Sequence, residues 1–261
     1  SFQMLSPSTQ GAEADGQYPW AVEAVLANQG LERVTLVSPE LETLPEHVPD
    51  PDLLFRAVLT GDLILCAPPD QRSALSPDDI PDWDSLNALA SQIGSIPVKS
   101  QPLAAVGEPL TLFALNDGVL ETLEQQGRSL YRAPLSEYLW FLWRDSGSVI
   151  AASWTEQMTE LGRLLRERSS FSKDPEGMRT AADQLLPGFA GANGRYRLAK
   201  ARELGRTSTG VLTLAPRYEN TETVLDMTGA LDGTSHFHLA MDSDWDESSW
   251  SRLNSFLYYL K

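Results

Sequence analysis

The sequence predicts an α/β protein made of Rossmann-like three-layer units with parallel sheets, arranged as two packed subdomains. Short apolar stretches alternate with segments of helical spacing, an order typical of parallel strands joined by helices. The clearest pair of strands covers residues 210–215 and 237–241, which are about twenty residues apart with no two-residue turn signal between them. This spacing suits a parallel crossover better than a hairpin.

The first subdomain is expected over residues 18–100. Helices are predicted for residues 19–29, 52–59 and 83–93, and strands for residues 33–38 and 62–66. Residues 67–81 are predicted to be a loop because prolines interrupt them. Residues 1–17 are small and polar, so we expect a disordered tail or a remnant of an expression tag there. A proline-rich connection near residue 100 marks the boundary to the second subdomain.

The second subdomain is expected over residues 101–261. Besides the C-terminal strand pair, strands are predicted for residues 110–115 and 129–132, and helices for residues 116–126, 154–169, 175–186, 195–204 and 245–260. Residues 222–228 are expected to be a short amphipathic segment. Asn116 stands at the N-cap position of its helix. The aromatic segment 135–143 is predicted to be buried packing rather than a surface that stacks on a ligand.

The charge of the chain limits its partners. A formal net charge of −16 argues against a general nucleic-acid binder, because neutralising phosphates requires Lys and Arg. Residues 1–127 carry 4 basic and 19 acidic side chains, residues 128–217 carry 14 and 9, and residues 218–261 carry 2 and 8. The basic middle could recognise an anion or an acidic partner, or it could be a solvated helix face. No apolar run reaches the ~18 residues of a membrane span, so we expect a cytoplasmic protein without membrane contact.

Cys66 is the single cysteine of the chain, which excludes an internal disulfide and a metal site of clustered thiolates. We predict a buried core thiol rather than a nucleophile, because no histidine is near it in sequence and burial raises the pKa of a thiol. The serine-hydrolase motif Gly-x-Ser-x-Gly and the dinucleotide motif Gly-x-Gly-x-x-Gly are both absent. The sequence therefore predicts neither a bound cofactor nor an identifiable catalytic group.

A ligand-binding loop is expected where the strand at residues 210–215 ends, because open α/β sheets bind ligands at the carboxyl ends of their strands. The side chains predicted to bind there are Arg217, Tyr218, Glu219 and Asn220. An arginine in this position could hold a phosphate or a carboxylate with two hydrogen bonds. The candidate ligand is thus a small anionic molecule.

His236, His238, Asp242 and Asp244 are a candidate metal site. Histidines two residues apart on a strand face the same side, and acids beyond the strand offer oxygen ligands suited to Mg²⁺ or Mn²⁺. The alternative is a pair of ordinary histidines, followed by acids that favourably occupy the first turn of the last helix. We prefer the alternative.

Short motifs in the second half follow one another in a fixed order. They are Gly107-Glu108, Asn116, Leu123-Glu124 with Gly127, and residues 134–138, then residues 210–212, 216–222, 238–242 and 252–257. In this order the chain resembles the component family of 2-hydroxyacyl-CoA dehydratase and benzoyl-CoA reductase, including the related domain found beside its activators, over residues 105–145 and 193–260. The resemblance implies an α/β scaffold in which Glu108, Asn116 and the loop at residues 217–220 bind an acyl-CoA or another anion.

One position departs from this family. In the family, a cysteine of the loop after the first strand of the pair helps to hold an iron-sulfur cluster, whereas Glu219 stands in its place here. Thiolates are the usual ligands of such clusters, and Cys66 cannot build one alone. The resemblance therefore implies a cluster-free relative that lacks the reductive dehydration of the family.

These observations together predict a non-catalytic accessory, assembly or regulatory protein that acts through protein–protein contacts. Two alternatives stay open at the level of sequence. One is a metal-assisted transferase or hydrolase centred on His236, His238, Asp242 and Asp244. The other is an acidic inhibitor of a basic partner protein, bound through charge complementarity.

Overall fold

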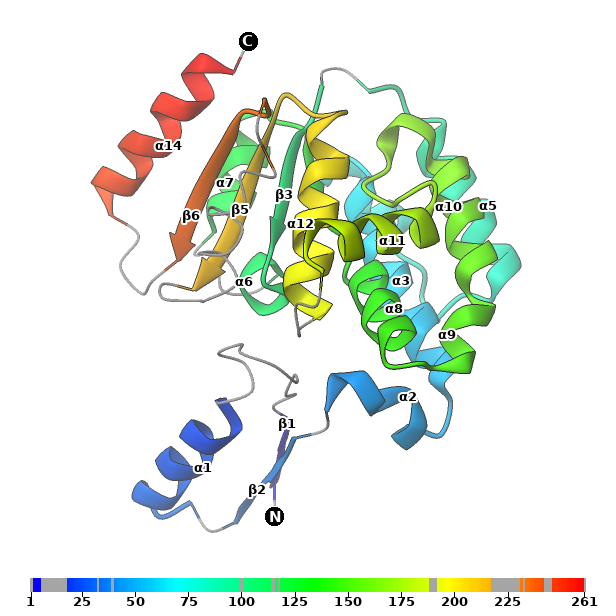
Figure 1. The fold of residues 1–261 in the computed structure, drawn as a ribbon, viewed down its shortest axis with the longest axis vertical. Coiled ribbons are helices and arrows are strands. Elements are labelled where there is room, and N and C mark those ends of the chain that lie inside the picture. The colour runs from blue at the N-terminus through cyan, green and yellow to red at the C-terminus, as the bar shows by residue number, and fades with distance from the viewer. Residues whose placement is uncertain are drawn as a thin grey trace.

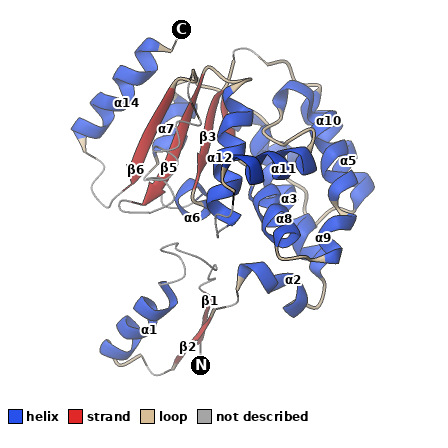
Figure 2. Cartoon of the chain, in the orientation of Figure 1, coloured by secondary structure: helices blue, strands red, loops and turns tan. Residues whose placement is uncertain are grey.

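Two parallel sheets, one of two strands and one of four, organise the computed structural model of the chain (Figure 1). Helices account for most of the remaining described residues (Figure 2). The structure describes residues 2–5, 18–31, 33–38, 40–98, 101–113, 116, 118–187, 192–216, 231, 233–241 and 246–260.

The N-terminal part of the chain contains the smaller sheet and five helices. Its elements are β1 (Phe2–Leu5), α1 (Tyr18–Asn28), β2 (Val34–Val37), the 3-10 turn η2 (Leu41–Thr43), α2 (Leu44–His47), α3 (Pro51–Cys66), α4 (Pro69–Leu75) and α5 (Trp83–Gly94). Strands β1 and β2 pair in parallel, with Phe2 opposite Val34. Residues 2–5, which fall within the predicted tail, are therefore a strand, whereas residues 6–17 lie outside the described residues.

The remaining part contains the larger sheet and most of the helices. Its elements are β3 (Leu103–Gly107), α6 (Pro109–Phe113), α7 (Val119–Gln125), β4 (Leu130–Arg132), α8 (Leu135–Asp145), α9 (Val149–Ser153), α10 (Thr155–Leu165), the 3-10 turn η3 (Arg166–Arg168), α11 (Pro175–Leu185), α12 (Ala192–Gly205), β5 (Gly210–Pro216), β6 (His236–Met241) and α14 (Glu247–Tyr259). The amphipathic segment predicted at residues 222–228 lies outside the described residues.

The larger sheet has the strand order β4-β3-β5-β6, and each neighbouring pair is parallel. In the register, Leu214 of β5 lies opposite Gly107 on one side and Leu239 on the other. This confirms the predicted α/β class with a parallel sheet. It also confirms the parallel crossover predicted for residues 210–215 and 237–241, because β5 and β6 are direct neighbours.

The register also assigns the helices to the two faces of the sheet. Arg132, Ala105, Leu212 and Phe237 form one row across the four strands, so their side chains share a face. Arg132 forms ion pairs with two glutamates of α7, and the Phe237 ring stacks on Phe256 of α14. Both helices therefore lie on that face. Helix α12 packs against β3 and β5 from the opposite face, in front of the sheet in Figure 1.

Aromatic side chains fill the centre of the helical layer. Trp140, Phe141 and Trp143 of α8 are fully buried, which agrees with the packing role predicted for residues 135–143. Phe55 of α3 stacks on Trp154, with ring centroids 4.2 Å apart. Helices from before and after residue 100 thus share one core, and the division into two subdomains at that position stays a prediction.

The strand predicted at residues 62–66 is wrong, because these residues form the C-terminal end of α3. The Asp50 carboxylate accepts a hydrogen bond from Leu53 N at 2.9 Å and Pro51 occupies the first turn, so the helix has a strong beginning. Its buried face consists of Phe55, Leu59, Asp62, Leu63 and Cys66. The apolar run continues a helical face that begins two turns earlier.

The strand predicted at residues 110–115 is also wrong. The buried strand is β3, which ends at Gly107, and Pro109 opens the short helix α6. Asn116 is not a helix cap, since Gly118 takes the N-cap position of α7 with a positive φ of 70°. Residues 69–75 form α4 within the predicted loop at residues 67–81.

Other predicted elements are confirmed. They are the helices at residues 19–29, 83–93, 154–169, 175–186, 195–204 and 245–260, and the strands at residues 33–38 and 129–132. None of the helices in the described ranges combines the length and the apolar composition that a membrane span requires.

Candidate functional site

The predicted ligand crevice lies at the carboxyl ends of β3 and β5. The chain leaves β3 toward β4 on one side and returns to β5 on the other, so the strand order reverses between β3 and β5. Ligands of open α/β sheets bind at such a reversal. Of the predicted ligand-binding residues, Glu108 and Asn116 are described, whereas Arg217, Tyr218, Glu219 and Asn220 lie outside the described residues.

Glu108 follows β3 directly and is buried. Its backbone N–H donates to Leu214 O at 2.9 Å, which continues the pairing of β3 with β5. Its carboxylate accepts hydrogen bonds from Thr111 N at 2.6 Å and from Thr111 Oγ1 at 2.8 Å. These bonds satisfy a free N–H group in the first turn of α6, so the described contacts of Glu108 are those of a helix cap.

Asn116 is buried between α6 and α7. Its Nδ2 donates to Leu112 O at 3.2 Å, whereas its Oδ1 has no hydrogen-bond partner among the described residues. A buried acceptor without a partner costs about 1–3 kcal/mol, so this oxygen suits an N–H or O–H group of a ligand. Since Oδ1 accepts hydrogen bonds, it does not itself favour an anion.

The two predicted metal-binding histidines lie on one face of β6, next to Thr213 of β5. The Thr213 hydroxyl is 2.8 Å from His236 Nε2 and 3.2 Å from His238 Nδ1. Both histidines lie before Met241, the last residue of β6. His238 is three residues before Met241, which in extended chain is a distance of ~10 Å.

The acidic half of the predicted metal site, Asp242 and Asp244, lies outside the described residues. Within the described residues, no group of three His, Cys, Asp or Glu side chains is arranged to hold a metal ion. The metal site therefore stays a prediction.

Cys66 ends α3 and is buried. Burial raises the pKa of its thiol to about 12, so the thiolate required of a nucleophile or a metal ligand is strongly disfavoured. Its position on a helix differs from the strand end predicted for it. Its burial agrees with the predicted core thiol.

A buried polar cluster connects α8 to α12, and sequence reasoning did not identify it. Lys200 of α12 has a fully buried ammonium group 2.7 Å from Glu137 of α8 and 2.8 Å from Glu203. The Tyr196 hydroxyl lies 3.1 Å from Glu137, whose other carboxylate oxygen accepts from Ser172 N at 2.5 Å. Although burial opposes a charge on Lys200, the carboxylates of Glu137 and Glu203 raise the pKa of this ammonium group.

Asp62 extends this buried network to α3. Its carboxylate accepts hydrogen bonds from Leu135 N at 3.1 Å and from both N and Oγ of Ser136 at 2.6 Å, at the beginning of α8. Burial raises the pKa of this carboxyl to about 6, against the lowering effect of those hydrogen bonds. The contacts of Asp62 are all internal, so it positions α8 against α3.

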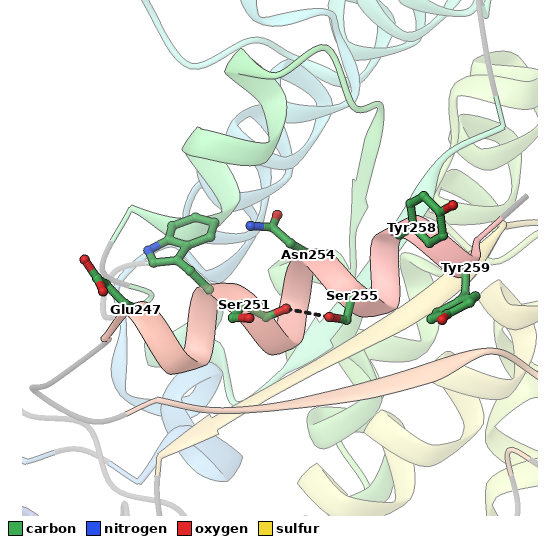
Figure 3. A pocket seen from close by; sticks show the side chains of 7 residues that line it. Glu247, Ser251, Asn254, Ser255, Tyr258 and Tyr259 are labelled. Atoms are coloured by element: carbon green, nitrogen blue, oxygen red, sulfur yellow. Dashed lines mark hydrogen bonds between the residues drawn. The ribbon is translucent and has the colours of Figure 1, made fainter.

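The outer face of α14 presents aromatic side chains to solvent. Tyr258 and Tyr259 are 78% and 77% exposed, and Trp250 is half-buried against the core. A surface hollow of about 570 Å³ follows this face, and Asn254 and Tyr258 point in the same direction along it (Figure 3). Its lining residues are Glu247, Trp250, Ser251, Asn254, Ser255, Tyr258 and Tyr259.

The inner face of α14 holds the helix to the sheet. Leu253 and Leu257 are buried, and the Phe256 ring stacks on Phe237 of β6 at 5.2 Å. The helix begins at Asp246, whose carboxylate accepts from Ser249 N at 2.8 Å. The sequence predicted this helix but not its exposed aromatic face, for which the pair of adjacent tyrosines is the available signal.

Comparison of the chain with protein-family models, with curated proteins and with solved structures found no match. The interpretation of the site therefore depends on the geometry described above.

Proposed function

We propose that this protein is an accessory or assembly factor that binds a partner protein through the outer face of α14. The observation that carries the proposal is the exposure of Tyr258 and Tyr259 beside the surface hollow on this helix. Tyrosine and tryptophan are enriched in protein interfaces, because each offers a large apolar area together with a polar group.

The chemistry of the partner follows from the acidic side chains Asp246 and Glu247, which begin α14. The C-terminal sequence is acidic in composition as well, with 2 basic and 8 acidic side chains in residues 218–261. We infer that the partner contributes a basic segment with an apolar side chain that fits the hollow. Such complementarity accelerates association and makes it sensitive to salt.

The character of the buried groups supports a binding role over a catalytic one. The charged groups between α8 and α12 are bonded to one another, and the Cys66 thiol is held neutral by its high pKa. We propose further that the chain is related to the dehydratase components but lacks their iron-sulfur cluster. We also propose that it acts in the cytoplasm, where a single thiol stays reduced.

Affinity capture with matched variants tests the proposal. Wild type, the double variant Tyr258→Ala/Tyr259→Ala and the control Trp20→Ala would each be immobilised and exposed to a lysate of the native host. Trp20 is 75% exposed and lies on α1, so the control removes an exposed aromatic ring elsewhere. We expect a protein that wild type and the control retain and that the double variant loses.

The captured protein should be released when salt is raised to about 1 M, where the Debye length is ~3 Å. Loss of two aromatic anchors should weaken binding by at least ~2 kcal/mol, or about thirtyfold. Retention of the same proteins by all three variants, or of none by wild type, would refute the proposal. A second copy of the chain as the retained protein would refute the inferred basic partner.

A further inference from the structure

A cavity of about 600 Å³ lies at the amino end of the larger sheet, opposite the end of the predicted crevice, and no residue of α14 lines it. Pro102 before β3 and Thr207 after α12 lie on its wall, together with Tyr131 and Phe171. Arg166 and Lys173 supply positive charge to the same wall. This volume is within the range of pockets that bind small molecules.

The two cations of this wall have no acidic partner in the part of the chain that the structure describes. Several other arginines of the basic middle are paired, for example Arg144, 2.7 Å from Glu176, and Arg195, 2.6 Å from Asp145. Arg168, beside Arg166, donates to the carbonyl oxygen of Ile96 at 2.7 Å. Arg166 and Lys173 differ from these bonded arginines, because no described group of the chain engages their side chains.

The acids of the wall are Glu167 and Glu203. The Glu203 carboxylate accepts from Lys200 Nζ at 2.8 Å and from Ser172 Oγ at 2.6 Å, so both of its oxygens are engaged in the buried cluster, where Lys200 also pairs with Glu137. Glu167 is exposed and makes no described ion pair. Neither acid forms a described ion pair with Arg166 or Lys173, so both cations are available to a ligand with an anionic group.

The backbone of Arg166 is strained. Its φ of 56° and ψ of −120° lie in a backbone region that residues other than glycine rarely adopt. Arg166 is the one described non-glycine residue with a positive φ. A glycine would remove this strain. Strained residues of this kind concentrate at functional sites, where the conformation serves binding or catalysis although it lowers stability.

We propose that this cavity binds a small carboxylate- or phosphate-bearing molecule, with its anionic group on Arg166 and Lys173. Arg166 offers a planar set of donors that matches either group, and Lys173 adds a point charge. Phe171 and Leu204 provide apolar wall for the rest of the ligand.

Binding of three probes to the full chain tests this site. Inorganic phosphate, pyrophosphate and citrate would be titrated by calorimetry at constant ionic strength, set with potassium chloride. We expect saturable binding of at least one probe. Binding of pyrophosphate but not of citrate would indicate a phosphate-bearing ligand. Binding of citrate but not of pyrophosphate would indicate a carboxylate-bearing ligand.

Four variants separate this site from general surface charge. Lys173→Ala should weaken probe binding about tenfold, and Glu167→Gln should strengthen it. Arg166→Gly should also weaken binding about tenfold while raising the midpoint of thermal unfolding, because it removes both the donors and the strain. The control Arg163→Ala removes an exposed arginine that pairs with Glu160, and it should leave probe binding unchanged.

The absence of saturable binding by all three probes would overturn the proposal. An equal loss in Arg163→Ala, or unchanged affinity in both Lys173→Ala and Arg166→Gly, would overturn it as well. Lys173 and Glu167 are exposed, so their variants carry the test even if Arg166→Gly does not fold.

Discussion

The buried cluster between α8 and α12 and the outer face of α14 differ in the solvent exposure of their side chains. In the cluster, Glu137 and Lys200 are fully buried and bonded to each other. On α14, Tyr258 and Tyr259 are mostly exposed. The first region holds the helices of this chain in one arrangement, whereas the second leaves interface-type side chains free to contact another molecule. The predictions below test this difference.

Breaking the buried pair should have the largest effect on stability. In Lys200→Met, the Glu137 and Glu203 carboxylates lose the buried ammonium group that pairs with both of them. We expect the free energy of unfolding, measured with urea, to fall by about 3–5 kcal/mol. The double variant Lys200→Met/Glu137→Gln should recover part of the loss. A change under about 1 kcal/mol in Lys200→Met would contradict the structural role of the pair.

The two faces of α14 should respond differently to substitution. Leu253→Ala removes a fully buried side chain and should lower the free energy of unfolding by about 2–5 kcal/mol. Tyr258→Ala alters an exposed side chain and should change it by no more than about 0.5 kcal/mol. Thermal or urea unfolding of both variants checks the contrast. Similar losses in the two variants would show that Tyr258 packs on its own chain.

Asp62 should make stability depend on pH. Its folded pKa of about 6 exceeds the ordinary 3.8, so the folded chain binds this proton more tightly than the unfolded chain. Asp62 therefore contributes at most ~3 kcal/mol to the free energy of unfolding. This contribution is complete below pH ~4 and is lost as the pH rises through about 6.

The variant Asp62→Asn isolates this contribution. Its NH₂ group would face backbone donors at the start of α8, which should destabilise the fold by about 1–3 kcal/mol near pH 4. The difference between wild type and variant should shrink as pH rises to about 7, because wild type alone loses the Asp62 term. Urea unfolding across this range measures the difference. A constant or growing difference would contradict the raised pKa.

Metal ions should have the smallest effect. His236 and His238 both contact the Thr213 hydroxyl, as expected of ordinary strand histidines. We expect Zn²⁺, Mn²⁺ and Mg²⁺ at millimolar concentration to shift the melting temperature of wild type no more than that of His236→Ala/His238→Ala. A site with Kd one hundred times below the metal concentration would add about 2.7 kcal/mol, and a shift of that size in wild type alone would establish the metal site.

The parts of the fold that the sequence predicted are those with local signals. Strands β5 and β6 are apolar runs without a hairpin turn between them, and the helix of α11 has the strong start Asp174-Pro175. The run from Asp62 to Cys66 was misread because a short apolar segment fits a buried strand and a buried helix face equally well. The helix cap at Asp50, twelve residues earlier, decides between them.

The buried cluster could not be predicted, because its members are distant in sequence. Glu137 and Lys200 lie on separate helices, and no sequence signal links the motif at residues 134–138, which contains Glu137, to Lys200. Lys200 sits within a basic run that resembles a solvated helix face, and only tertiary packing shows that its ammonium group is buried. For α14, periodicity predicted a helix but not which of its aromatic residues face solvent.

The most direct measurement is photo-crosslinking from the outer face of α14. A photoreactive phenylalanine analogue would replace Tyr258 in one sample and Trp20 in a second, and both proteins would be irradiated in cells. The account predicts a crosslink from position 258 to one basic partner protein and none to that protein from position 20. No protein crosslink from position 258, or the same products from both positions, would contradict it.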